Sequence, residues 1–140
     1  MKFQAINDLK MGIRSINLDV ISERALERNQ SEISELNRGQ LEQGITSTGG
    51  FLPDYSPVSV QMFGKPEGPI KLKDTGDYYE GIVPRFDFKS FTLNGTDEKT
   101  DMLQKKYGKY GDPIGLTDES KGELAQIILP DVLDELREKI

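Results

Sequence analysis

Apolar residues recur at intervals of three and four through the first part of the chain, and this spacing predicts a helix over residues 5–42. Its apolar face is formed first by closely spaced positions: Ile6, Leu9, Ile13, Ile16 and Val20. The face thins at Asn29 and Gln30 before it continues at Ile33 and Leu41. The opposite face mixes Glu and Arg, which favours a solvated surface. Such a helix packs on the core of its own domain or, because its apolar stripe is narrow, on a neighbouring subunit.

The helical pattern ends at Gly44, and residues 44–70 are dense in Gly, Pro, Ser and Thr. We predict a Gly/Pro-rich loop or hairpin here, with a turn at Thr48-Gly49-Gly50. A loop this long in a small domain is usually functional or ordered by a partner. The alternative is a disordered linker, but the segment carries more apolar side chains than linkers do. They are Phe51, Leu52, Tyr55, Val60, Met62 and Phe63.

Alternation of apolar and polar residues then predicts antiparallel strands over residues 78–94. Phe86 and Phe88, for example, alternate with charged residues. Pro84 marks a sheet edge or a break, because proline cannot donate a ladder hydrogen bond. The pair Asn94-Gly95 predicts a turn that closes this region.

Two further helices complete the predicted order of elements. A short helix is predicted over residues 97–107, ending at Gly108. A longer helix is predicted over residues 117–140, with Thr117 as its N-cap and a kink near Pro130. The predicted fold class is α+β, in a single domain over residues 1–140. It combines a long N-terminal helix, a small antiparallel β-sheet with an extended Gly/Pro-rich loop, and a C-terminal helix packed on the sheet.

Composition and charge narrow the possible functions. The 140 residues carry a formal net charge of −6, which argues against a dedicated nucleic-acid clamp because phosphate binding needs an excess of Lys and Arg. A local basic patch remains at Lys99, Lys105, Lys106 and Lys109. The chain has no cysteine and no histidine, which excludes disulfides, thiolate chemistry, His-based catalysis and the usual zinc ligands. No signal peptide or membrane-spanning run is visible, so we expect a soluble cytoplasmic protein without membrane contact.

The triplet Asp74-Thr75-Gly76 matches the short signature of the aspartic proteases. Those enzymes need two carboxylates that share a proton in a dry, apolar cleft of a mostly β framework. Here Lys73 precedes the triplet and Asp77 follows it, and the chain is predicted to begin and end in helices. We therefore interpret Asp74 as part of a solvent-facing turn or cap and not as a catalytic acid.

Metal and cofactor sites are not indicated by the remaining motifs. The acidic residues near Asp97 and Asp118 lack the alternating oxygen ligands of a calcium loop and are typical of helix N-termini. The glycine pairs match no phosphate-binding pattern. The run from Tyr107 to Gly111 interleaves aromatic residues with lysine, as some nucleic-acid binders do, but a packed turn is the better interpretation in an acidic chain. We expect no enzymatic activity, no metal and no cofactor.

Three segments together resemble a known family: GQLEQGITSTGGFLPDYSP, IKLKDTGDYYEGI and YGKYGDPIGLTDESKGEL. They are similar to the virion morphogenesis and tail-completion (neck) proteins of tailed phages and prophages of gut bacteria. In that family a Ser/Thr-Gly pair leads into the sheet, and the residues that match are Leu72, Thr75, Gly76, Tyr78 and Tyr79. The junction before the last helix is matched by Tyr107, Gly108, Gly115 and Leu116.

The resemblance implies a non-enzymatic structural protein that assembles into a ring at the head–tail junction or at the tail end. The expected partners are further copies of the chain and other virion proteins, such as the connector, tail tube or terminator. Contact with DNA would be at most passing. The candidate structural or interface residues are Thr75, Gly76, Tyr78, Tyr79, Phe51, Tyr55, Tyr107 and Gly108. The alternative is a soluble bacterial adaptor that uses the 44–70 loop for protein recognition.

Overall fold

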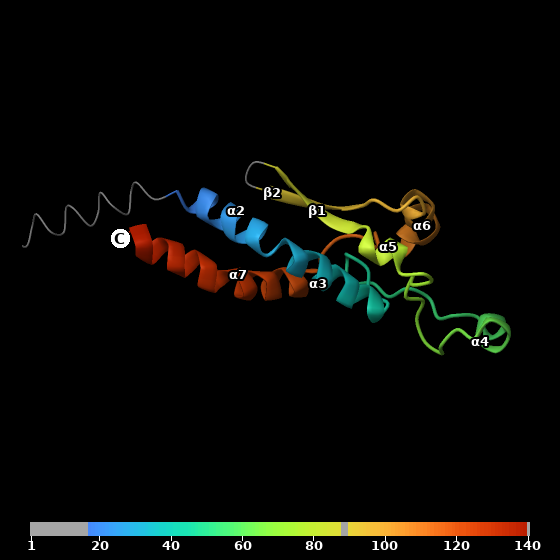
Figure 1. Cartoon of the computed structure of the whole chain (residues 1–140). Helices are drawn as coiled ribbons and strands as arrows, with labels where there is room; N and C mark the ends of the chain where they lie inside the picture. Colours follow the sequence, from blue (N-terminus) through green and yellow to red (C-terminus); the bar gives the residue numbers. More distant parts are fainter. Residues whose placement is uncertain (1–16, 88–89, 140) are drawn as a thin grey trace, which may run out of the picture.

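A computed structural model describes residues 17–87 and 90–139. The fold is α+β, as predicted: a layer of helices is partly covered by a two-stranded antiparallel hairpin (Figure 1). In chain order, the elements are α2 Leu18–Arg28, α3 Gln30–Glu42, α4 Pro57–Phe63, α5 Asp77–Glu80, β1 Ile82–Asp87, β2 Ser90–Gly95, α6 Thr100–Tyr107, the 3-10 turn η1 Gly108–Tyr110, and α7 Asp118–Lys139.

The single helix predicted over residues 5–42 is wrong at Asn29, where the helix ends and a new one begins. The Asn29 amide nitrogen donates to the Ala25 carbonyl at 2.7 Å and to the Asp131 carboxylate of α7 at 2.8 Å. A short polar side chain of this kind competes with the backbone for helical hydrogen bonds. The described helix α2 begins after Asn17, whose side chain accepts from the N–H groups of Asp19 and Val20. Residues 5–16 of the prediction lie outside the described residues.

α7 lies against α2 and α3 and is the longest described element. The Thr117 hydroxyl accepts the Ser120 N–H at 3.1 Å, which confirms the predicted N-cap. The helix runs through Pro130 without restarting. Pro130 and Gln126, the residue four positions earlier, are both exposed. The helical hydrogen bond that the proline cannot make therefore lies on the exposed side of α7.

The hairpin pairs Asp87 with Ser90 at one end and Ile82 with Gly95 at the other. Two predictions are corrected here. The strands begin at Ile82, because Tyr78 and Tyr79 belong to the short helix α5. Asn94 and Gly95 are the last residues of β2, where they pair with Val83 and Ile82, so they do not form a turn. A β-carbon at position 95 would overlap the Thr100 side chain, which explains a glycine inside a strand.

The outer edge of β1 is partly covered. Arg38 of α3 donates to the carbonyl groups of Tyr79, Glu80 and Ile82. Pro84 pairs with Leu93 of β2 and lies on the same edge of β1 as Ile82, because alternate backbone groups of a strand point the same way.

Two apolar clusters hold the elements together. The first joins α3, the 44–70 segment and α5 through Leu41, Leu52, Tyr78, Tyr79 and Ile82. The second is built on Ile33, Leu116 and Leu124, with Phe86, Phe91 and Ile128 packed against it. Because the second cluster contains side chains of both strands and of α7, the C-terminal helix packs against the sheet, as predicted.

The 44–70 segment is more structured than a plain loop. Two isolated bridges, Ile45 with Phe51 and Asp54 with Pro69, are consistent with the predicted hairpin character. Between the two halves of the second bridge the chain forms the helix α4, which was not predicted. Its polar N-cap, Ser56, accepts the Ser59 N–H at 3.1 Å, and its C-cap, Gly64, has φ +66°.

Candidate interaction sites

The segment Lys71–Gly81 is a structural junction. Gly76 is the N-cap of α5 with φ +92°, a conformation that residues with a β-carbon resist. The Thr75 hydroxyl accepts the Asp77 N–H at 3.3 Å and so helps to turn the chain into α5. The Thr75-Gly76 pair thus redirects the backbone toward α5 and β1.

The two tyrosines that follow belong to the core of the subunit. Tyr78 is 4% exposed and Tyr79 is 5% exposed. The Tyr79 hydroxyl donates to the Lys71 carbonyl at 2.5 Å, and Arg38 donates to the Tyr79 carbonyl at 2.7 Å. Burial, reinforced by nearby acidic groups, raises the pKa of both phenols well above 10. Both rings are therefore neutral at physiological pH, and neither offers a docking surface.

Asp74 lies on the surface: its side chain is 79% exposed and its carboxylate is 3.8 Å from the Lys65 ammonium. A shared-proton carboxylate pair needs a dry site, and this carboxylate does not lie in one. The placement agrees with a solvent-facing turn.

Tyr107 and Gly108 form the end of α6. Tyr107 is half-buried against the first cluster, and Gly108 is the exposed C-cap that leads into η1. The Lys106 ammonium lies 5.4 Å from the centre of the Tyr107 ring, and Lys109 is placed in the same way over Tyr110 at 5.2 Å. These lysines contact aromatic rings of their own subunit, as cation–π pairs do.

A polar latch that the sequence did not predict connects α3 to the start of α7. Asn37 donates to the Pro113 carbonyl at 3.0 Å and accepts the Gly115 N–H at 2.9 Å. Gln40 donates to the Gly115 carbonyl at 2.8 Å and accepts the Thr117 N–H at 3.0 Å. The sequence signal for this latch was a pair of amide side chains, Asn37 and Gln40, three positions apart on one helix face between the apolar Ile33 and Leu41.

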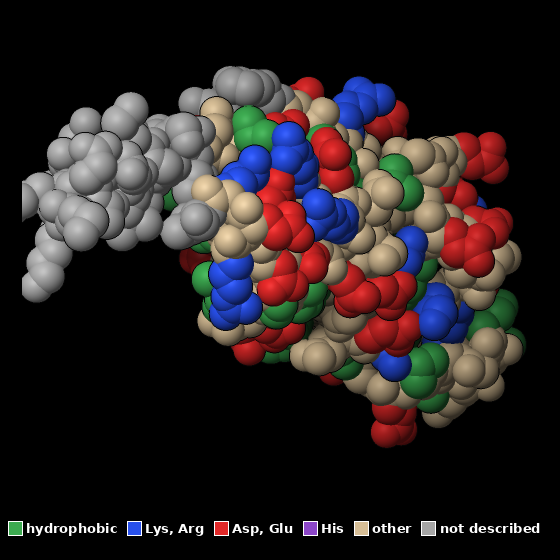
Figure 2. Space-filling model, turned by 60° about the vertical axis from the view of Figure 1, so that its left-hand side comes forward, with side chains coloured by type: hydrophobic (Ala, Val, Ile, Leu, Met, Phe, Trp, Pro, Cys, Tyr) green, Lys and Arg blue, Asp and Glu red, His purple; other side chains and the backbone are tan. Residues whose placement is uncertain are grey.

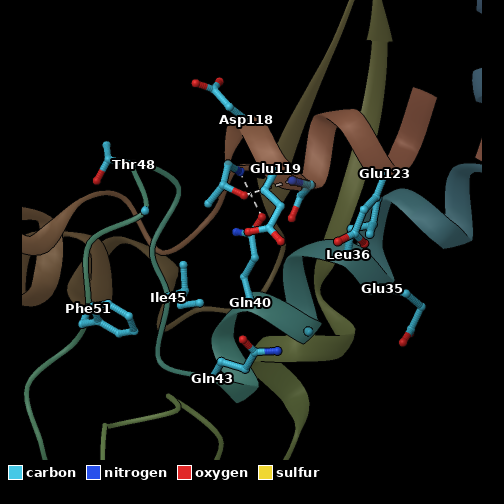
Figure 3. A pocket seen from close by; sticks show the side chains of 14 residues that line it. Glu35, Leu36, Gln40, Gln43, Ile45, Thr48, Phe51, Asp118, Glu119 and Glu123 are labelled. Carbon is cyan, nitrogen blue, oxygen red and sulfur yellow. Dashed lines mark hydrogen bonds between the residues drawn. The ribbon is translucent and has the colours of Figure 1, made fainter. Parts of the chain in front are cut away.

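Beside this latch lies an open cleft of about 550 Å³ between the end of α3, the 45–51 turn and the start of α7 (Figure 3). Its walls carry four carboxylates and no basic side chain: Glu35, Asp118, Glu119 and Glu123. Phe51 also borders it and is 67% exposed. Within the described parts of the chain, no group of three or more acidic residues could hold a metal ion. Two of these carboxylates already have basic partners outside the lining: Glu35 lies 2.6 Å from Arg38, and Asp118 lies 4.0 Å from Lys121. These partners weaken the attraction of the cleft for cations, and its walls carry no histidine or thiol.

Residues 53–70 form an arm, named so from here on, that is closed at its base. The Ile70 N–H donates to the Pro53 carbonyl at 2.8 Å, and the Tyr55 N–H donates to the Gly68 carbonyl at 2.9 Å. Tyr55 is half-buried at this base, where its hydroxyl accepts the Lys71 N–H at 3.4 Å. The arm thus has a defined fold of its own.

At the tip of the arm, α4 contains no buried residue. Val58, Met62 and Phe63 are 60%, 75% and 72% exposed. The helix lies at the margin of the molecule, away from the body formed by α2, α3 and α7 (Figure 1). An apolar helix that is ordered but touches little of its own subunit is a candidate contact for another protein.

A second apolar surface lies elsewhere on the molecule. It is a groove of about 790 Å³ between β2 and α7, which we call the β2–α7 groove. Its lining includes Leu26, Phe91, Leu93, Leu124, Ala125 and Ile128. By contrast, Figure 2 shows a face where acidic and basic side chains are interspersed and the apolar patches between them are small.

In the part of the chain that the structure describes, no helix is both long enough and apolar enough to span a membrane. Comparison of the chain with protein-family models, with curated proteins and with solved structures gives no match.

Proposed function

We propose that the chain is a non-enzymatic structural subunit of a tailed phage or prophage, of the tail-completion or head–tail connector (neck) class. In this role it assembles into a ring and joins virion components. The observation that carries the proposal is the ordered arm, which presents Val58, Met62 and Phe63 to solvent. A part that works by contact needs such a surface, whereas an enzyme needs a pocket with activated groups.

The residues that carry the family resemblance support the same proposal. Gly76 turns the chain into α5, and Tyr78 and Tyr79 anchor that helix in the core. At the second matching junction, Gly115 is held by the latch and Leu116 is buried in the second cluster. These are framework roles, which is what a protein that works by assembly requires.

Virion composition tests the proposal directly. Particles released from a host that carries the gene are purified and analysed by mass spectrometry, and the gene is deleted in parallel. We expect the chain in wild-type particles, and we expect unjoined heads and tails, or incomplete tails, after deletion. Complementation with the intact gene should restore joined particles. Normal particles after deletion, with the chain absent from the wild-type virion, would refute the proposal.

The adaptor alternative is favoured by the same arm, because an exposed apolar helix also suits a recognition element. The two functions differ in what the arm contacts. An adaptor would bind a host protein and stay out of purified particles. The deletion experiment therefore separates them.

A further inference from the structure

We infer that the arm of one copy docks, through the apolar face of α4, in the β2–α7 groove of the next copy. The inference rests on the proposed ring assembly and names the contact that would build it. Two features of one chain carry it: an ordered apolar tip that has no buried residue in the described part of the chain, and an apolar groove at a different place on the molecule.

Both surfaces carry few charged residues. Of all residues in the chain, 30% are charged, yet α4 has the sequence PVSVQMF and carries none. The groove lining contains one acidic residue, Asp112, and one basic residue, Lys121. Asp112 already accepts from the Ile114 N–H and from Gln104, so it is satisfied within its own subunit. The Lys121 side chain is 65% exposed, and its ammonium lies 4.0 Å from the Asp118 carboxylate. An uncharged helix therefore brings no further charge into the apolar contact.

The geometry requires two copies. α4 lies at the end of the molecule away from β2 and the middle of α7, and the base of the arm is fixed by hydrogen bonds (Figure 1). The arm of one subunit thus points away from its own groove. A contact between two different surfaces of identical subunits is heterologous, and repeating it gives a closed ring or a filament.

The contact is small. A standard protein interface uses roughly 20–30 residues on each side, whereas α4 has seven. Free subunits should therefore associate weakly and in a concentration-dependent way. In a closed ring each subunit gives one arm and receives one, so that every subunit is held twice.

The absence of cysteine allows a clean cross-linking test. A tagged Met62→Cys subunit is mixed at high concentration with an untagged Ala125→Cys subunit and treated with a short bismaleimide, which joins two thiols. Met62 is exposed on α4, and Ala125 is exposed in the groove. The matched control replaces Ala125→Cys by Gln126→Cys, the next residue of α7, which is exposed but does not line the groove. We expect the mixed dimer with Ala125→Cys in roughly tenfold excess over the control.

Charged variants identify the occupant of the groove. Met62→Glu and Ala125→Glu should each weaken self-association by roughly tenfold or more, because each places a carboxylate in an apolar contact. In a mixture of the two variants, the Ala125→Glu subunit keeps an intact arm and the Met62→Glu subunit keeps an intact groove. It should form dimers but no larger species in sedimentation velocity. Unchanged melting curves would show that both variants fold.

The inference would be overturned by equal cross-linking of the Ala125→Cys and Gln126→Cys pairs, or by no cross-linking at any concentration. Association of Met62→Glu subunits as tight as that of the wild type would do the same and would leave another protein as the occupant. The virion test is independent. If the chain is found in virions and no arm–groove cross-link forms, this inference fails and the proposed function stands. If the arm–groove cross-link forms but the chain is absent from virions, the arm–groove contact stands and the proposed function fails.

Discussion

At the scale of single residues, the junction before β1 concentrates its constraints in a few positions. Gly76 holds the backbone at φ +92°, and Tyr78 and Tyr79 fill the first cluster. Asp74, only two residues before Gly76, is exposed and makes one loose ion pair. Asp74, which first suggests a catalytic role, thus contributes least to the structure of this junction.

The first prediction concerns the backbone at Gly76. Gly76→Val should lower the free energy of unfolding by about 1–2 kcal/mol, because a β-branched residue resists the left-handed conformation. Steric overlap is not the cause, since a β-carbon there meets nothing within 4 Å. Asp74→Asn is the control and should change stability by less than about 0.5 kcal/mol. Urea unfolding of the wild type, Gly76→Val and Asp74→Asn measures the three stabilities. Equal stability of Gly76→Val and the wild type would contradict the prediction.

The second prediction concerns pH and the buried phenols. The pKa of Tyr78 and that of Tyr79 are raised above 10 in the folded chain, mainly by burial, so the folded state holds these protons more tightly than the unfolded state does. Their contribution to stability is complete below pH 10 and is lost as the pH rises above 10. Each phenol should contribute a slope that approaches about 1.4 kcal/mol per pH unit.

Urea unfolding between pH 8 and pH 11 measures this slope, and Tyr78→Phe serves as the reference because it keeps the ring and removes the ionisable group. The quantity to compare is the difference between the two proteins, because they differ only in the Tyr78 hydroxyl. The variant should lose stability less steeply above pH 10. Parallel curves for both proteins would show that the Tyr78 phenol does not titrate differently in the folded state.

At the scale of elements, α7 is an uninterrupted helix with a proline in its interior. The residue pattern predicted the N-cap and the extent of this helix closely, because Thr117 and the apolar spacing are local signals. The effect of Pro130 depends instead on whether its missing hydrogen bond is exposed to water. That depends on the tertiary structure and could not be read from the sequence.

The third prediction follows for the same element. Pro130→Ala should raise the free energy of unfolding by about 1–3 kcal/mol, because the alanine restores a backbone donor and removes the clash of the proline ring. Thermal and urea unfolding measure the change, with the exposed Gln126→Ala as a control on the same helix. A less stable Pro130→Ala protein would mean that the proline is needed for the packing of α7 on α2.

Other elements depend on contacts between residues far apart in the sequence, which local sequence patterns do not predict. The apolar spacing predicted helix on both sides of Asn29, but the break depends on the contact of Asn29 with Asp131, which is distant in sequence. Asn94-Gly95 is a strong local turn signal, yet the register of the hairpin includes both residues in β2. The latch could not be predicted for the same reason, since Asn37 bonds to a segment far along the chain.

At the scale of the whole molecule, the arm is attached to the body mainly through its base. The hydrogen bonds that close it join Pro53 to Ile70 and Tyr55 to Gly68, whereas α4 has no buried side chain. The body should therefore fold without the tip of the arm.

The fourth prediction tests this separation. Replacement of residues 57–67 by a short Gly-Ser linker should change the free energy of unfolding by less than about 1 kcal/mol, because little apolar surface is lost from the core. Circular dichroism melts measure stability, and sedimentation velocity measures association of the same protein. We expect a normal melt together with loss of association. A large drop in stability would show that the arm is part of the folding unit.

The covered edge of β1 has a consequence for aggregation. A strand at the edge of a sheet can recruit strands from other chains, and such pairing leads to insoluble polymers. Arg38 occupies the backbone acceptors at the start of β1, and Pro84 offers no donor further along that edge. Unwanted growth of the sheet is thereby opposed on the β1 side. This arrangement favours solubility when the protein is concentrated.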